Sequence, residues 1–301
     1  MSRLNLSLLE FGKTFPPEQL AHHVINNLFE DVSLYENLGY KRLWLSEHYS
    51  PEFAWFNPEM LMPLLAGYSE KIKIGLAGVL LGYHSPLRVA QNFKILSSIY
   101  AGRIDLGLAR ASVPENTSVF LISKEEVKSV VENWETKVAQ LVSFLRNWEP
   151  EKSLLKNMIV PPHGTDLPDV WVLGASGNSV NIAVENKANF CLSFMHPGSN
   201  YRKSKDVIKR FKEEYLKKHL ILPETSVLLA SFATDDKDLI QRYGLQYNQE
   251  AEINPFGPAD YIKEELVRLQ RELESDEFVI YCPVPERCQR IAHYQSIIDP
   301  G

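Results

Sequence analysis

Long apolar runs and amphipathic stretches alternate along this chain, most clearly in residues 71–111. An apolar run over 72–81 is followed by a helical pattern over 87–100 and by a second apolar run over 104–108. A strand with one exposed face would alternate between apolar and polar residues, whereas these runs are almost continuously apolar. The pattern therefore predicts two parallel strands that are covered on both faces and joined by a helix in a right-handed crossover.

The same reading predicts eight strands, mostly separated by helices. The strands are expected at residues 4–11, 42–47, 72–81, 104–108, 170–173, 190–195, 226–233 and 278–282. Helices are expected at 16–38, up to 69, at 87–100, at 124–146, after 179, at 201–219, at 260–273 and from 285 onward, with a loop at 112–123 and a charged segment after 233. Eight strand–helix units predict an α/β fold, a closed (β/α)8 TIM barrel formed by residues 1–301 as a single domain. An open doubly wound sheet is the alternative, but the EFGK stretch at 10–13 lacks the glycine-rich fingerprint that usually follows its first strand.

Composition narrows the class of protein. Hydrophobic residues make up 45% of the chain, and 32 Lys and Arg against 38 Asp and Glu give a net charge of −6. This balance predicts neither a nucleic-acid partner nor an anionic membrane surface. The N-terminal residues lack the pattern of a secretion signal, and no apolar run approaches the length of a membrane span. Three cysteines without a pairing pattern indicate a reducing, cytoplasmic location.

In a parallel barrel, the carboxyl ends of the strands carry the chemistry and the amino ends carry stability. Arg103 and Asp105 stand at the amino end of a predicted strand, so a structural role is expected for both. Arg110 stands at the carboxyl end of the same strand, and His48 and His196 follow two others. The carboxyl ends therefore gather the candidate functional residues.

The turn at residues 174–179 is the best candidate for an anion site. The small residues Gly174, Ala175, Ser176 and Gly177 allow close approach to the backbone, and Ser179 ends the turn before the next helix. Hydroxyl groups and the first N–H groups of that helix can donate to phosphate oxygens. From the turn alone, an ordinary capped helix start with Ser at the N-cap is the favoured explanation. A guanidinium on a neighbouring strand, that of Arg110, shifts the balance towards a phosphate site.

Glu47 and His48 end the second predicted strand. The pKa of a histidine lies near neutral pH, so His48 is a candidate general base or a donor to a bound ring. A strand-end pair that only bonds loop backbone is the alternative. For Glu47 we expect a bracing role at the barrel rim rather than a role in orienting His48. Nearby aromatic residues could wall an apolar pocket or pack on the next helix: Phe53, Trp55 and Phe56.

Two other classes of site find little support. The sequence shows no close spacing of His, Asp and Glu that would indicate a metal site. It also has no G-x-S-x-G elbow of the kind that carries a serine nucleophile.

Three blocks of sequence resemble the bacterial luciferase-like flavin monooxygenases. They are RLWLSEHY, IGLAGVLLGYHSPLRVAQNF with GRIDLGLARA, and DVWVLGASGNSVNIAVENKANFCLSFMHP, and the tail from FGPADYIKEEL to DEFVIYCP also fits. The resemblance covers nearly the whole chain. It implies a (β/α)8 barrel that binds reduced FMN, or in some relatives a deazaflavin, at the carboxyl ends of the strands.

The resemblance also assigns roles to residues. The phosphate ligands of the family fall on Arg110 and on the turn at 176–179, and its active-site histidine falls on His48. A non-proline cis peptide of the family falls on Ala77-Gly78, where it would form a ledge against the flavin ring. The second histidine of luciferase is Tyr49 here. Its reactive cysteine is Ala109 here, and together these departures argue against light emission.

The expected function is a non-luminescent monooxygenase that uses reduced FMN and dioxygen to oxidise a small organic substrate. A separate flavin reductase would supply the reduced FMN, because no nicotinamide fingerprint is visible in the sequence. A non-catalytic flavin-binding protein and a deazaflavin-dependent oxidoreductase are the alternatives. The second of these would need basic groups beside Arg110 for a longer tail, and the sequence indicates none. The resemblance also implies a homodimer formed through helices beside the second and third strands.

Overall fold

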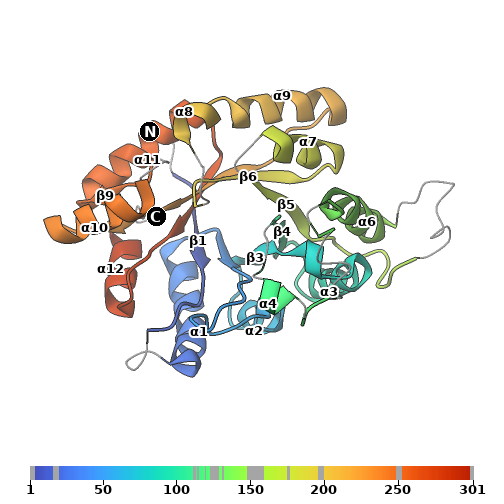
Figure 1. Cartoon of the computed structure of the whole chain (residues 1–301), viewed down its shortest axis with the longest axis horizontal. Coiled ribbons are helices and arrows are strands. Elements are labelled where there is room, and N and C mark those ends of the chain that lie inside the picture. Colours follow the sequence, from blue (N-terminus) through green and yellow to red (C-terminus); the bar gives the residue numbers. More distant parts are fainter. Residues whose placement is uncertain are drawn as a thin grey trace.

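The structure, a computed structural model, describes most of the chain. The described residues are 4–15, 20–110, 113, 115–118, 120–122, 129–130, 132–147, 159–174, 177–195, 200–248 and 253–298. Eight parallel strands close into a barrel in the order β1-β10-β7-β6-β5-β4-β3-β2, and helices surround them (Figure 1). The (β/α)8 prediction is confirmed.

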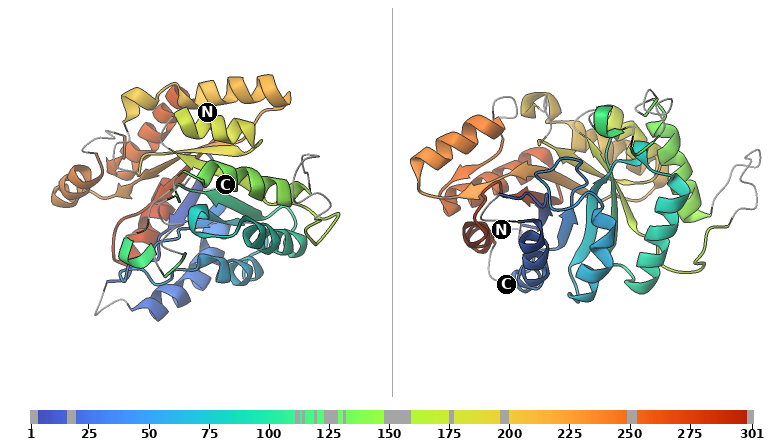
Figure 2. Two further views of the ribbon diagram at one scale, coloured as in Figure 1. Left: turned by 45° about the vertical axis from the view of Figure 1, so that its right-hand side comes forward. Right: turned by 60° about the horizontal axis from the view of Figure 1, so that its bottom comes forward.

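Strand bounds agree closely with the expectation from the sequence. The barrel strands are β1 (Leu6–Glu10), β2 (Arg42–Leu45), β3 (Lys73–Val79), β4 (Ile104–Leu108), β5 (Asp169–Gly174), β6 (Asn189–Ser193), β7 (Thr225–Ala230) and β10 (Glu277–Tyr281). Both views of Figure 2 show the strands inside a ring of helices. The longer helices are α1 (Ala21–Leu38), α3 (Pro86–Ile99), α6 (Trp134–Arg146), α7 (Gly177–Glu185), α9 (Val207–His219), α10 (Lys237–Asn248), α11 (Ala259–Leu273) and α12 (Arg287–Ile297). The shorter ones are η1 (Pro58–Met60), α2 (Met62–Gly67), η2 (Leu81–Tyr83), α4 (Glu115–Ser118) and α8 (Tyr201–Ser204).

Several predicted elements differ in the structure. The strand expected at 226–233 ends at Ala230, because the next residues leave the barrel and form β8 (Phe232–Ala233), which pairs with β9 (Phe256–Gly257). The charged segment after 233 contains α10, at the outer edge of the molecule in Figure 1. Residues 201–219 form two helices rather than one, and the expected loop at 112–123 includes the single turn of α4.

Of the helix expected at 124–146, the structure describes α6, which begins at Trp134. Val130 lies in a turn before it and packs on η2, where a Cβ on Gly82 would meet Val130 Cγ1 at 2.5 Å. Residues 123–128 and 131 lie outside the described part of the chain.

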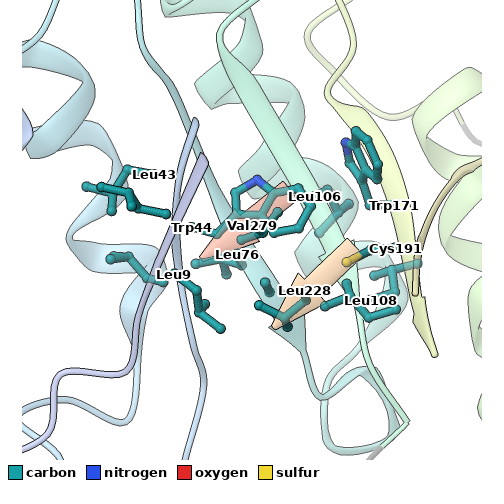
Figure 3. Close-up of a cluster of buried hydrophobic side chains, with 14 of the residues drawn as sticks. Leu9, Leu43, Trp44, Leu76, Leu106, Leu108, Trp171, Cys191, Leu228 and Val279 are labelled. Carbon is teal, nitrogen blue, oxygen red and sulfur yellow. The ribbon is translucent and has the colours of Figure 1, made fainter. Parts of the chain in front are cut away.

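Two buried tryptophans occupy the barrel interior together with aliphatic side chains. Trp44 from β2 and Trp171 from β5 meet across the barrel with ring centroids 5.3 Å apart, and Figure 3 shows them among the surrounding aliphatic side chains. Gly75 makes room for this layer, since a Cβ there would lie 2.8 Å from Trp44 Cδ1. Interior side chains fill barrels of eight strands in such layers.

Below the tryptophans, a cluster of charged residues closes the amino end of the barrel. Arg42, only 4% exposed, donates to Asp105 at 3.1 Å and to Glu277 at 2.9 Å, and it also pairs with Glu224. Trp44 Nε1 donates to Asp105 at 2.8 Å. The structural role expected for Asp105 is confirmed.

Arg103 has the structural role expected of it as well. Its guanidinium donates to the carbonyl oxygens of Ala66, Ser69 and Ile72, which links the start of β4 to α2 and to the segment between α2 and β3. No helix among the described residues combines the length and the apolar character that a membrane crossing requires.

Candidate active site

A cavity of about 400 Å³ lies at the carboxyl ends of the barrel strands. Its size is in the range of small-molecule and cofactor sites. Its walls come from β1 to β7 and the loops that follow them. The lining residues are Leu9, Phe11, Glu47, His48, Tyr49, Ser50, Glu52, Phe53, Ala77, Gly78, Leu80, Ala109, Val113, Leu173, Met195 and Leu228. The set is mainly apolar, and its polar members gather in the segment after β2.

His48 stands in this wall between two aromatic rings. The ring centroids of Phe11 and Phe53 each lie 4.9 Å from the centroid of His48, and they lie 6.4 Å from each other. His48 Nδ1 lies 3.0 Å from Ser46 Oγ, and the indole of Trp55 donates to the Ser46 carbonyl oxygen at 3.0 Å. Phe53 therefore lines the pocket, as one of the two readings expected, whereas the buried Trp55 packs against Gly12 after β1.

The peptide bond between Ala77 and Gly78 is cis, as the family resemblance implies. Both residues line the cavity at the end of β3. Gly78 packs closely against the next strand, since a Cβ there would lie 3.0 Å from backbone atoms of Gly107 and Ala109. This close approach gives the cavity a backbone wall at that point.

Arg110 and the turn at 174–179 follow neighbouring strands, β4 and β5, which pair in register with Leu108 opposite Val172. Both therefore lie at the carboxyl end of the barrel. Arg110 is exposed and comes directly after Ala109 in the cavity wall, and Gly174 comes directly after Leu173. The structure thus brings Arg110 and Gly174 to neighbouring strand ends, each one residue beyond the cavity lining.

Gly174 and Ser179 pack closely against each other. A Cβ on Gly174 would lie 2.1 Å from Ser179 Oγ, so only glycine lets the first turn of α7 pack onto the end of β5. Gly177 is the first residue of α7, whose N–H groups are available at a helix N-terminus. Ala175 and Ser176 lie outside the described residues, as does His196, and their predicted roles stay predictions.

One cation near this turn was not expected from the sequence. Arg210 in α9 donates through Nη2 to the carbonyl oxygen of Gly177 at 2.8 Å. It also lies 3.5 Å from Glu214 one helical turn further on. The basic run in 202–218 is visible in the sequence, but only the packing of α9 beside α7 brings this guanidinium to the turn.

Glu47 braces the rim, as expected. Its Oε2 accepts the Leu80 N–H at 2.9 Å, and its Oε1 accepts the Tyr49 hydroxyl at 2.7 Å. His84 Nε2 lies 2.7 Å from the same Oε1. Thus a buried carboxylate after β2 holds the loop after β3, including a residue of the cavity wall.

Among the described residues, no group of three or more His, Cys, Asp or Glu is arranged to hold a metal ion.

Together, the fold and this cavity define a barrel with a cofactor-sized apolar site at the carboxyl ends of its strands. The family model of the luciferase-like monooxygenases matches residues 9–248, and the chain belongs to this family of oxidoreductases.

Comparisons of sequence give two relatives from Bacillus subtilis (strain 168). The N-acetyl-S-alkylcysteine monooxygenase is 24% identical over 332 residues, covering 99% of this chain and 97% of the relative. The uncharacterized protein YwcH is 32% identical over 181 residues, covering 60% of this chain and 53% of that protein. The match therefore spans only about half the length of some curated relatives.

Solved structures share the fold across nearly the whole chain. Apo-MsnO8 has a TM-score of 0.78 at 21% identity and covers 98% of this chain and 97% of its own. The oxygenating constituent of 3,6-diketocamphane monooxygenase from Pseudomonas putida, in complex with FMN, has a TM-score of 0.74 at 16% identity and covers 98% and 96%. An F420-dependent secondary alcohol dehydrogenase has a TM-score of 0.70 at 13% identity and covers 99% and 100%. At these identities the likeness shows the fold alone.

Proposed function

We propose that this protein is a non-luminescent monooxygenase that uses reduced FMN and dioxygen to oxidise a small, mainly apolar organic substrate. One observation carries the proposal. The cavity at the carboxyl ends of the strands combines apolar walls, the cis peptide at Ala77-Gly78 and His48, and Arg110 stands directly beyond its lining. A flavin needs both an apolar slot for its ring and a cationic rim for its phosphate, and this arrangement provides both.

The residues divide the work as follows. Arg110 and the turn at 174–179, with Ala175, Ser176, Gly177 and Ser179, hold the phosphate, since a guanidinium presents a fork of donors to it. Ala77 and Gly78 support the flavin ring. The bound reduced flavin supplies the electrons and activates dioxygen, which is the chemistry that the cofactor brings.

His48 holds or moves a proton beside the reacting atoms. Its Nδ1 is oriented by the Ser46 hydroxyl at 3.0 Å, and the flanking aromatic rings fix the plane of the imidazole. The apolar walls exclude water and so protect the reaction from side paths. A separate reductase would deliver the reduced flavin.

Flavin titration of the wild type and of Arg110→Met tests the phosphate site. We expect the variant to bind FMN about tenfold to a hundredfold more weakly, the value of a hydrogen bond to a charged group. Riboflavin lacks the phosphate, so its affinity should be equal in both proteins. Equal loss for both ligands would show that Arg110 does not contact the phosphate.

Aerobic turnover with reduced FMN and a panel of small apolar substrates tests the oxygenase activity. His48→Ala should keep its flavin affinity and lose turnover by about 10²-fold to 10⁴-fold, as expected for a proton-transfer group. Equal rates in the wild type and in the variant would remove His48 from the mechanism. Flavin binding with no turnover on any substrate would support the non-catalytic alternative.

A deazaflavin-dependent oxidoreductase is the second candidate, and one observation favours it. Arg210 places a further guanidinium at the start of α7, next to the turn that would hold an anionic tail. One solved structure of the same fold is an F420-dependent alcohol dehydrogenase. Parallel titrations with FMN and the deazaflavin, on the wild type and on Arg210→Met, distinguish the two. If the wild type binds the deazaflavin more tightly than FMN, and Arg210→Met weakens that binding, the deazaflavin would replace FMN as the proposed cofactor.

We also propose that two copies pair through η1, α2 and α3. An apolar stripe is exposed there, made by Met60 at 67%, Leu64 at 52% and Tyr68 at 65%. Ile95 and Ile99 on α3 add 44% and 62% exposure. The elements are neighbours, since the α3 residue Asn92 bonds Glu59 and the Tyr100 hydroxyl bonds the Pro63 carbonyl oxygen. An exposed apolar patch of this kind is typical of an interface.

A further inference from the structure

The carboxylate of Glu47 connects three segments in the cavity wall. It is 4% exposed, and three different segments bond to it: Tyr49 from its own loop, Leu80 from the end of β3 and His84 from the turn before α3. Leu80 and Tyr49 both line the cavity, as does Glu47 itself. A buried carboxylate is costly unless it is paired. The pairing partner of Glu47 therefore affects the shape and the charge of the cavity wall.

His84 is the cationic partner that lies in contact with this carboxylate. Its Nε2 is 2.7 Å from Glu47 Oε1, and its side chain is 32% exposed. The loop that carries His84 is bonded to α6. Lys137 of α6 donates to the carbonyl oxygens of Gly82 at 2.6 Å and of His84 at 3.2 Å. His84 thus stands between solvent and the cavity wall.

Other charged groups face this pair. Glu59 of η1 lies close enough to influence both His84 and Glu47, and Lys137 opposes it. Arg88 of α3 acts on Glu59 in turn. Burial lowers the pKa of His84, but the hydrogen bond and the charge of Glu47 outweigh burial and raise the pKa above its ordinary value of 6.5.

We infer that His84 is a positioning residue for the flavin site. Its protonated ring balances the charge of Glu47 and fixes the carboxylate, so that the carboxylate holds Leu80 and Tyr49 in the cavity wall. The inference rests on the proposed flavin-binding function. When His84 loses its proton, the wall carries an uncompensated negative charge. An anionic cofactor such as FMN is then bound more weakly, since like charges repel across a site of low dielectric.

The test measures the FMN dissociation constants of the wild type and of His84→Gln from pH 5.5 to pH 9. Glutamine can bond Glu47 but carries no charge. We compare the proteins by dividing the dissociation constant of His84→Gln by that of the wild type. This ratio cancels the titration of FMN itself. We expect this ratio to be about tenfold below pH 6.5 and to fall towards one as the pH rises through the raised pKa of His84.

His23→Gln is the matched control, since His23 is exposed on α1 and does not line the cavity. Its ratio to the wild type should be one at every pH. For His84→Gln, a ratio that is constant across the pH range would overturn the proposal, because a purely structural role does not depend on the proton. A ratio of one throughout would overturn it as well.

A second measurement separates this inference from the proposed function. Thermal unfolding of the flavin-free wild type and of His84→Gln should differ below pH 6.5 and converge above the raised pKa. A folded-state pKa that is raised stabilises the protein fully below the unfolded value, and this stabilisation is lost as pH rises. If no flavin binds but this difference is present, the cofactor assignment fails and the His84–Glu47 pair stands. If FMN binds and both pH signatures are absent, the inference alone fails.

Discussion

Removing Arg42 should destabilise the barrel without altering the active site. Arg42 lies at the amino end of β2, 4% exposed, and neutralises Asp105 and Glu277, which are 0% and 4% exposed. Its third partner, Glu224, is 54% exposed and can turn towards water. Arg42→Met keeps most of the apolar stem but leaves two buried carboxylates without their cation.

The expected loss of unfolding free energy is about 3–5 kcal/mol, the cost of breaking a buried ion pair from one side. Asp105 keeps the Trp44 N–H at 2.8 Å, and Glu277 keeps the Ser7 hydroxyl, so we expect the lower half of this range. For a chain of this size the melting temperature should fall by about 5–6 °C, since the unfolding entropy is about 2.1 cal/mol/K per residue.

The loss should depend on pH in a definite direction. Burial raises the pKa of Asp105 and of Glu277 in the wild type, and the Arg42 charge opposes that shift. Without Arg42 both pKa values rise further, so the folded variant binds more protons than the unfolded chain. Its stability relative to the wild type should therefore recover as the pH falls from 7 towards 5.

Thermal or urea unfolding monitored by circular dichroism measures these changes. Lys41→Met, one residue earlier and exposed, is the control and should stay within about 0.5 kcal/mol of the wild type. Arg42→Met combined with Asp105→Asn should be more stable than the sum of the single variants predicts, because one stranded charge is removed. An Arg42→Met protein as stable as the wild type, or with the same pH profile, would refute the reasoning. A changed FMN affinity of Arg42→Met would contradict the separation between the amino end of the barrel and the site at its carboxyl end.

Three further predictions concern other parts of the chain. Gly174→Ala should lower the FMN affinity at least about tenfold in a flavin titration, because the new Cβ would displace Ser179 from the end of β5; an unchanged affinity would exclude that turn. Glu36→Gln should cost about 1–2 kcal/mol at pH 7 in urea unfolding, since Glu36 accepts the N–H groups of residues 70–72. Burial raises the pKa of Glu36, but these bonds outweigh burial and lower it, so the difference should vanish as pH falls through that lowered value; a constant difference would contradict this. Leu64→Glu should convert a dimer to a monomer in sedimentation analysis, and an unchanged mass would place the interface elsewhere.

Much of the fold follows from hydrophobic patterning. The strand at Ile104–Leu108 has the predicted bounds, and the others agree within a few residues, because strands buried on both faces leave long apolar runs. The helix α10 was missed because it is mostly exposed, with Tyr243 as its buried residue and charged residues around it. A helix with so small an apolar face gives little periodic signal.

The site was predictable in outline, because strand ends can be read from the sequence. The rule that strand amino ends carry stability identified Asp105, and the carboxyl ends supplied His48. The partners could not be read in the same way. Glu47 meets His84 only through the packing of two loops, and Arg210 reaches Gly177 only because α9 lies against α7. Such pairings depend on three-dimensional packing that a single sequence does not encode visibly.

The filled interior of the barrel has a consequence for the order of events during turnover. Leu9, Leu173 and Leu228 line the cavity, and below its level Trp44 and Trp171 occupy the barrel. Molecules therefore reach the cavity from the carboxyl side. Whichever of two ligands sits deeper has to arrive first and depart last. The architecture thus implies a compulsory order of binding. In product-inhibition kinetics, a product should then compete with only one of the two ligands.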